Sequence, residues 1–378
     1  MTEQAAKFTK GALRYVAALG GLMWWCSPLP VRAVSFNFFC ESDPTCSSFN
    51  LSALSGFQQA AGLWTQLFSD DMMVRIEIAF KPLDGSILGG ASAALNIAPY
   101  SGYRAVLDSD RTSVFDDLAL SSLPAQSSFP LLINRTSDHP SEAGSASPYL
   151  DNDQGANNAS IVLSTANVKA LGVNPVYDGT SNPEGVDGWI TFNSAFSWDF
   201  DRANGIAGGL YDFVGVAAHE IGHVMGFLSG VDDLDDTSSG PSFNSENDYT
   251  YVQPLDLYRY SIESKEAGAI DWTADARSKY FSIDGGVNNL VDFSTGVTHG
   301  DGRQASHWKD NLGNGLMDPT FASGEQGAIT SFDVLAFDVI GYDRRELNEQ
   351  VPAPLPLAGS LAAVAWARRL RRRARAGG

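Results

Sequence analysis

Basic side chains are scarce in this chain. Its 378 residues include 25 Lys and Arg against 44 Asp and Glu, which gives a formal net charge of −19 at pH 7. A protein with this excess of negative charge repels the phosphates of nucleic acids and the head groups of anionic lipids. The composition therefore excludes nucleic acid as a partner, and it suits a soluble exported protein or one that binds calcium.

Cysteine is nearly absent. Of the three cysteines, Cys26 lies in an apolar N-terminal segment, and Cys40 and Cys46 bound the short stretch "CESDPTC". In an exported protein such a pair is expected to form a local disulfide that closes a short loop. A metal site made from these two cysteines alone is the less favoured interpretation.

The N-terminus lacks an apolar run long enough to span a membrane. Three basic residues among the first 14 precede the apolar segment 15–25, and the small residue Ala33 suits cleavage. This order is typical of a secretory signal peptide, here residues 1–33. A buried N-terminal helix is the alternative.

The C-terminal residues 347–378 are also unusual in composition. The Pro-rich motif "VPAPLP" precedes a short apolar segment, 355–367, and six arginines follow. This order resembles the PEP-CTERM sorting tails of Gram-negative bacteria. The resemblance implies a protein at the cell surface or outside the cell, with a tail that meets the membrane only until a sorting protease acts on it. A plain membrane anchor is the alternative, because arginines after an apolar stretch stay on the cytoplasmic side.

Helical and strand patterns alternate between residues 34 and 346, which predicts one α/β (α+β) domain. Strands are predicted at 72–80, 159–165, 188–193, 255–261 and 279–286, and helices at 51–71, 213–225 and 331–343. Ser331 is the expected N-cap of the last helix. Residues 231–248 are expected to be an acidic loop.

The motif "HEIGHVMGF", residues 219–227, points to a metal site. His219 and His223 are four residues apart, so they share one face of the predicted helix 213–225. A catalytic zinc takes three protein ligands and a water, and this pair supplies two of the three. Glu220 then lies beside the metal, as general base for zinc-activated water.

The ends of that helix are also marked in the sequence. Asp212 is the expected N-cap, and Gly226 is expected to end the helix. Gly226 lets the chain turn sharply, so that a later residue can reach the metal. The pattern matches the metzincin form HExxHxxGxxH except at its last position, where Ser229 replaces the third histidine.

The third ligand must therefore come from elsewhere. The three remaining histidines are His139, His299 and His307. His307 is favoured because Met317 follows ten residues later, and a Met-turn places a methionine under the histidines as a hydrophobic base. His139 is expected to be an exposed loop histidine. The alternatives left open are His299 and an acidic residue, Asp232 or Asp233.

The segments "HEIGHVMGF", "SHW", "LMDP" and "ITSFDVLAFDVIGYD", in this order and with a long insertion at 231–300, resemble the leishmanolysin-like metallopeptidases. The resemblance covers about 210–343 and implies a metzincin-like zincin domain with a mixed, twisted sheet, an active-site helix, a Met-turn and a C-terminal helix. By this resemblance His219, His223 and His307 bind zinc, Glu220 is the general base and Met317 belongs to the Met-turn. The cysteine-rich framework of the eukaryotic members is missing.

The function expected from these features is zinc-dependent endopeptidase activity on proteins or peptides. The alternative is a non-catalytic extracellular matrix or adhesion protein that keeps the fold. The acidic stretch 231–240 could bind calcium, although a solvated loop is favoured. Tyr211 and Tyr342 could donate to an oxyanion, but packing is the favoured role for both, as it is for Trp308.

Overall fold

The computed structural model describes residues 33–40, 46, 49–83, 85, 87–238 and 243–345. Apart from Ala33, the predicted signal peptide 1–33 and the predicted tail 347–378 lie outside these residues. Within the described ranges, no helix is both long and apolar enough to cross a bilayer. The Sγ atoms of Cys40 and Cys46 lie 2.15 Å apart, at disulfide distance.

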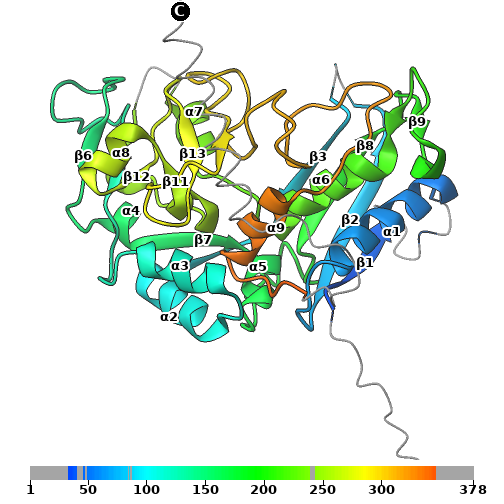
Figure 1. Cartoon of the computed structure of the whole chain (residues 1–378), viewed down its shortest axis with the longest axis horizontal. Helices are drawn as coiled ribbons and strands as arrows, with labels where there is room; N and C mark the ends of the chain where they lie inside the picture. Colours follow the sequence, from blue (N-terminus) through cyan, green and yellow to red (C-terminus); the bar gives the residue numbers. More distant parts are fainter. Residues whose placement is uncertain are drawn as a thin grey trace, which may run out of the picture. The chain divides into compact units, whose positions relative to one another are not determined.

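The largest described sheet is a four-stranded mixed sheet next to helix α6 (Phe213–Met225), which carries His219 and His223 (Figure 1). Its order is β1 (Ser35–Cys40), β2 (Met73–Lys81), β8 (Gly188–Asn193) and β3 (Gly89–Ala93). The first three strands are parallel, and β3 is antiparallel to β8 at the edge of the sheet. The predicted mixed sheet is therefore confirmed.

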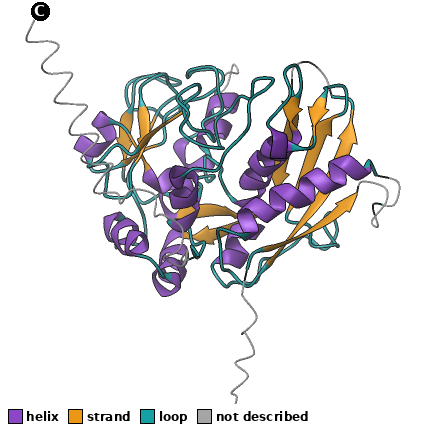
Figure 2. Ribbon diagram, turned by 45° about the vertical axis from the view of Figure 1, so that its right-hand side comes forward, coloured by secondary structure: helices purple, strands orange, loops and turns teal. Residues whose placement is uncertain are grey.

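Two helices, α1 (Leu51–Thr65) and α6 (Phe213–Met225), pack on this sheet and on each other (Figure 2). The Asn50 side chain begins α1 by accepting a hydrogen bond from the Ala53 N–H at 3.0 Å. The Phe57 ring of α1 lies 5.1 Å from Phe192 of β8 and 5.3 Å from Phe213, the first residue of α6. These ring contacts anchor the start of α6 over the sheet.

The remaining elements form smaller sheets and short helices. The small sheets are β4 (Leu95–Pro99) with β7 (Ser160–Ser164); β5 (Leu131–Ile133), β6 (Tyr149–Asp151) and β12 (Ile270–Asp271); β9 (Trp198–Asp199) with β10 (Tyr211–Asp212); and β11 (Arg259–Tyr260), β13 (Lys279–Phe281) and β14 (Val291–Phe293). The helices are α2 (Tyr100–Asp110), α3 (Val114–Ser122), α4 (Ala156–Ala159), α5 (Thr165–Ala170), α7 (Val231–Thr237), α8 (Ile262–Ala267) and α9 (Ser331–Asp338), with 3₁₀ turns η1 (Arg202–Asn204), η2 (Glu246–Asp248) and η3 (Pro254–Tyr258).

Several predicted elements are confirmed, and others are wrong in part. The helix predicted at 51–71 ends at Thr65, and the strand predicted at 279–286 covers only Lys279–Phe281. Residues 231–248 are not simply a loop, because α7 and η2 lie within them. Of the strand predicted at 255–261, only Arg259–Tyr260 is a strand, β11. Residues 255–258 belong to η3, which begins with Pro254 and is buried throughout. The last helix ends at Asp338, and Thr330, not Ser331, accepts hydrogen bonds as its N-cap.

Candidate metal centre

Side chains from other elements bind helix α6 in its middle and at its C-terminal end. Gly226 ends it with φ +119°, a left-handed conformation that favours glycine, as the sequence predicted. The Trp64 indole N–H donates to the Ala218 carbonyl at 2.9 Å, and the Tyr342 hydroxyl donates to the Met225 carbonyl at 2.6 Å. Asp212 occupies the N-cap position, but its carboxylate accepts no hydrogen bond from the helix. Because the Tyr342 hydroxyl donates to a carbonyl of α6, the structure favours the packing role of Tyr342 over a role as an oxyanion donor.

The three predicted histidine ligands meet in space. The Nε2 atom of His223 lies 3.1 Å from that of His219 and 3.2 Å from that of His307, and the third separation is also 3.2 Å. Ligands at a Zn–N distance of about 2.0–2.1 Å in a tetrahedral site are about 3.3–3.4 Å apart. The triangle therefore has nearly the size that one zinc ion requires.

The other ring nitrogens define which tautomer each histidine adopts. Nδ1 of His219 lies 2.8 Å from the Leu316 carbonyl oxygen, and Nδ1 of His223 lies 2.7 Å from that of Phe227. Nδ1 of His307 faces the Gln304 carbonyl at 3.4 Å. A carbonyl oxygen only accepts, so Nδ1 carries the hydrogen and Nε2 presents a lone pair. Three lone pairs then point at one another, an arrangement that a cation between them would stabilise.

Burial keeps these imidazoles neutral. It lowers the pKa of His219 to about 3, with a further contribution from His223, and it lowers the pKa of His223 to about 4. Burial is also the main cause that lowers the pKa of His307. Neutral imidazole is the form that binds zinc, so the donor set fits this metal without the loss of a proton.

Glu220 follows His219 in the same buried turn of α6. Its side chain is 6% exposed, and burial raises its pKa to about 8. A divalent cation held by the histidines would act in the opposite direction and favour the carboxylate. Glu220 is therefore a buried carboxyl group, next to His219 in the chain, whose protonation a bound cation would change.

Met317 packs against the turn of α6 that carries both histidines. It is fully buried, and a Cβ built on Gly222 would lie 2.6 Å from its Sδ. The Asp333 carboxylate accepts hydrogen bonds from the backbone N–H groups of Leu316 at 2.8 Å and of Met317 at 3.2 Å. The turn at 316–317 thus supplies both the hydrophobic base and the carbonyl that orients His219.

The segment that carries His307 is held between two parts of the chain. The Ser294 N–H donates to the His307 carbonyl at 3.0 Å, and the Trp308 N–H donates to the Met317 carbonyl at 2.9 Å. The Trp308 indole N–H donates to Asp333 at 2.8 Å. Trp308 is buried, in accord with its predicted packing role, and it links the third histidine to the turn.

The structure places the alternative third ligands elsewhere. Asp232 accepts hydrogen bonds from the backbone of Ala305 and Ser306, and the His299 N–H donates to Asp235. Among the described residues, neither Asp232, Asp233 nor His299 belongs to the group that the three histidines form. Ser229 donates to Asp256 at 2.6 Å. His139 is buried, not exposed as expected, because its Nε2 bonds to the Ser147 carbonyl at 2.9 Å.

The described acids of 231–240 do not form a group of three with their oxygens within ligand reach. Such a group exists elsewhere, where oxygens of Asp151, Asp153 and Glu246 lie within 4.8 Å of one another. Each of these carboxylates already accepts a hydrogen bond, from Asn157, Gly155 and Tyr149 respectively. Their proximity alone does not indicate a calcium site.

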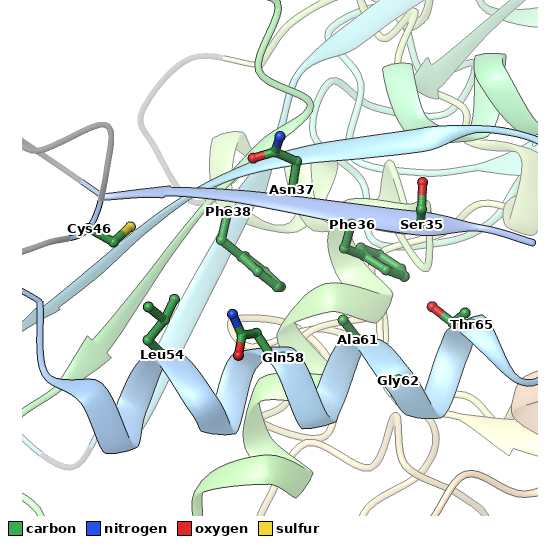
Figure 3. A pocket seen from close by; sticks show the side chains of 10 residues that line it. All are labelled: Ser35, Phe36, Asn37, Phe38, Cys46, Leu54, Gln58, Ala61, Gly62 and Thr65. Carbon is green, nitrogen blue, oxygen red and sulfur yellow. The ribbon is translucent and has the colours of Figure 1, made fainter.

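A hollow of about 510 Å³ lies between β1 and α1 (Figure 3). Its walls include Phe36 and Phe38 from β1, and Leu54 and Ala61 from α1. None of the three histidines lines it, so it is separate from the candidate metal centre.

Sequence reasoning missed three residues that shape the centre: Gly222, Leu316 and Asp333. Gly222 and Leu316 act through close approach and through a backbone carbonyl, and neither leaves a signal in a motif. Asp333 follows Thr330 by three residues, a spacing that predicts a helix cap. The cap is present, but nothing in the spacing indicates the additional bonds to 316–317.

Comparisons with known proteins do not place the chain in a family. No family model matches it, and neither a curated protein nor a solved structure does so. Function is therefore inferred from the geometry and chemistry of the site.

Proposed function

We propose that this protein is a zinc-dependent endopeptidase with a metzincin-type site. The observation that supports the proposal is the convergence of three Nε2 lone pairs, from His219, His223 and His307, at separations of 3.1–3.2 Å. Glu220 beside them and Met317 against the same turn of α6 complete the set expected from the resemblance to leishmanolysin-like enzymes.

Zinc, when bound, polarises the scissile carbonyl and makes water a stronger nucleophile at neutral pH. Glu220 accepts the proton of the attacking water and then delivers it to the departing amine. The Leu316 and Phe227 carbonyls hold the rings of His219 and His223 in place while this happens. Bonds of this kind orient metal ligands and raise their basicity.

The edge strand β3 is the proposed support for an extended peptide. Among the described strands β3 pairs only with β8, and it lies beside α6. Its outer N–H and C=O groups are available for an added strand, which is a common mode of peptide recognition. A peptide bound in this way would run past the helix that carries Glu220.

We also infer export, from the signal-like residues 1–33 and the tail-like residues 347–378. Both segments belong to the proposal only, since the described structure bears on neither. A sorting protease is the partner that the tail would require.

The proposed activity is tested by the hydrolysis of casein and of a mixed peptide library. The zinc-loaded wild type is compared with Glu220→Gln, and with Glu266→Gln on the exposed side of α8 as control. Glu220→Gln is expected to retain zinc and to lose activity by about 10²-fold or more. Glu266→Gln is expected to match the wild type.

Two results would count against the enzyme. Activity in Glu220→Gln equal to that of the wild type would remove the glutamate from its role. Zinc-loaded wild type that cleaves neither casein nor any library peptide would favour the non-catalytic matrix or adhesion protein.

A further inference from the structure

The segment between the second and third histidines does more than connect them. Helix α7 (Val231–Thr237) begins five residues after Gly226, the residue that ends the histidine helix. Its acidic side chains were expected to be solvated or to bind calcium. Two of them instead bind backbone N–H groups in the segment that leads to His307.

Asp232 holds the two residues that immediately precede His307. Its Oδ1 accepts from the Ala305 N–H at 2.5 Å, and its Oδ2 accepts from the Ser306 N–H at 3.1 Å. Charged acceptors make stronger hydrogen bonds than neutral ones. The start of α7 is thereby joined to the backbone of the third ligand.

Arg259 holds the same backbone from the other side. Its Nη1 donates to the Ala305 carbonyl at 3.1 Å, and its Nη2 donates to the Ser294 carbonyl at 2.6 Å. Arg259 as a whole is 1% exposed. The central carbon of its guanidinium group lies 4.9 Å from the centre of the Phe293 ring. Ala305 therefore has its N–H bound to an acid and its C=O bound to a base.

We propose that Asp232 and Arg259 are positioning residues that fix His307 at the distance from α6 that a metal requires. This inference rests on the proposed zinc site and adds the residues that pre-form it. Ordering a ligand from a distant segment costs conformational entropy when the metal binds. We call the hydrogen bonds of Asp232 and Arg259 to residues 305–306 the clamp. Because the clamp orders this segment before the metal binds, it is expected to raise the affinity for zinc.

The test compares Asp232→Asn with Asp235→Asn in the protein as exported, residues 34–350. Asp235 is a matched control, since it lies on the same helix and also accepts two backbone N–H bonds, from Thr298 at 2.7 Å and His299 at 2.8 Å. Three quantities are measured: the zinc dissociation constant by chelator competition, the visible spectrum of the cobalt(II)-substituted protein, and the Tm of the metal-free protein.

Asp232→Asn is expected to bind zinc about 10–100-fold more weakly and to alter the cobalt spectrum, because an amide cannot accept both N–H bonds through separate oxygens. Asp235→Asn is expected to keep zinc affinity within about threefold and to keep the spectrum, even if its metal-free Tm falls equally. The proposal is wrong if Asp232→Asn keeps the zinc affinity and the cobalt spectrum of the wild type. It is also wrong if both variants lose zinc affinity equally.

If Asp232→Asn does not fold, Arg259→Lys decides in its place, because it keeps the charge and loses the fork that reaches two carbonyls. A similar drop in zinc affinity supports the clamp, and wild-type affinity contradicts it. Wild-type protein that binds no zinc would refute the proposed function together with the clamp, whereas a loss confined to the variants supports both.

Discussion

Gly222 of α6 and Met317 of the turn at 316–317 approach so closely that a Cβ on Gly222 would lie 2.6 Å from the methionine Sδ. Non-bonded heavy atoms normally lie about 3.5–4.0 Å apart, so a Cβ at position 222 would require the Met317 side chain to shift. Met317 is fully buried, so this shift would disturb the packing around it. Gly222 immediately precedes His223. The contact therefore joins the packing of the turn to the placement of the histidines.

Gly222→Ala is expected to destabilise the protein by about 1–3 kcal/mol, the usual cost of overpacking a core. A loss of stability would be informative, because in a helix alanine is otherwise more stable than glycine by about 0.5–1 kcal/mol. Chemical denaturation of the metal-free protein measures the effect.

Gly62→Ala in α1 is the matched control. A Cβ there would meet nothing within 4 Å, so this variant is expected to be as stable as the wild type or more stable. Equal stabilisation by both substitutions would show that Met317 does not pack against α6 as described.

Asp333→Asn is expected to lower the free energy of unfolding by about 2–4 kcal/mol and to weaken zinc binding. Its carboxylate accepts from the N–H groups of Leu316, Met317, Thr330 and the Trp308 indole. In the asparagine variant, an NH₂ group would replace one carboxylate oxygen and would face N–H groups that also donate. Denaturation and chelator competition report the two effects.

Asp338→Asn, in the same helix α9, gives the contrast. Burial, with Asp116 nearby, raises the pKa of Asp338 to about 7, and Arg344 acts against this rise. A neutral amide at this position is expected to cost little at pH 8 or to stabilise. A loss in Asp338→Asn as large as in Asp333→Asn would contradict a specific role for Asp333 in holding the turn.

Asp70 is expected to make stability fall as the pH rises. Burial, and then the charge of Asp343, raises its pKa to about 8. The unfolded chain has a value of about 3.9, so between these limits the folded protein holds a proton that the unfolded chain releases. The stabilisation is fully present below about pH 4 and is lost as the pH rises to about 8.

Asp70→Asn removes this titration. The variant is expected to match the wild type at pH 4 and to be more stable at pH 8 by at least about 1 kcal/mol, or about 2 °C in Tm. Thermal unfolding at the two values of pH measures the difference. A gain that is the same at pH 4 and pH 8 would exclude the ionisation of Asp70 as its cause.

Helix α6, which carries His219 and His223, was predictable from the sequence because its determinants are local. The spacing of His219 and His223 places them on one face, and Gly226 ends the helix where a left-handed residue is needed. The parallel strands β2 and β8 were predictable for the same reason, since alternation and β-branched residues mark them.

The prediction of His307 as the third ligand rested on elimination, on the nearby Met317 and on the resemblance to leishmanolysin-like enzymes. The true supports of His307 are Asp232 and Arg259, which lie 75 and 48 residues before it and bind backbone groups, which have no sequence signature. Residues 231–260 were misread for a related reason. The acids of 231–237 suit a solvated loop, but this segment forms α7 and buries Val231, Leu234 and Asp235. The alternating leucines of 255–258 suit a strand, but this segment belongs to the buried turn η3.

Three histidines from two distant segments are proposed to hold one zinc ion. The most direct test of this proposal is the zinc content of purified residues 34–350, wild type beside His307→Ala, with folding checked by circular dichroism. We predict about one zinc per wild-type chain and a folded variant that has lost it. A folded His307→Ala protein that keeps its zinc with wild-type affinity, or a wild type that binds none, would contradict the account.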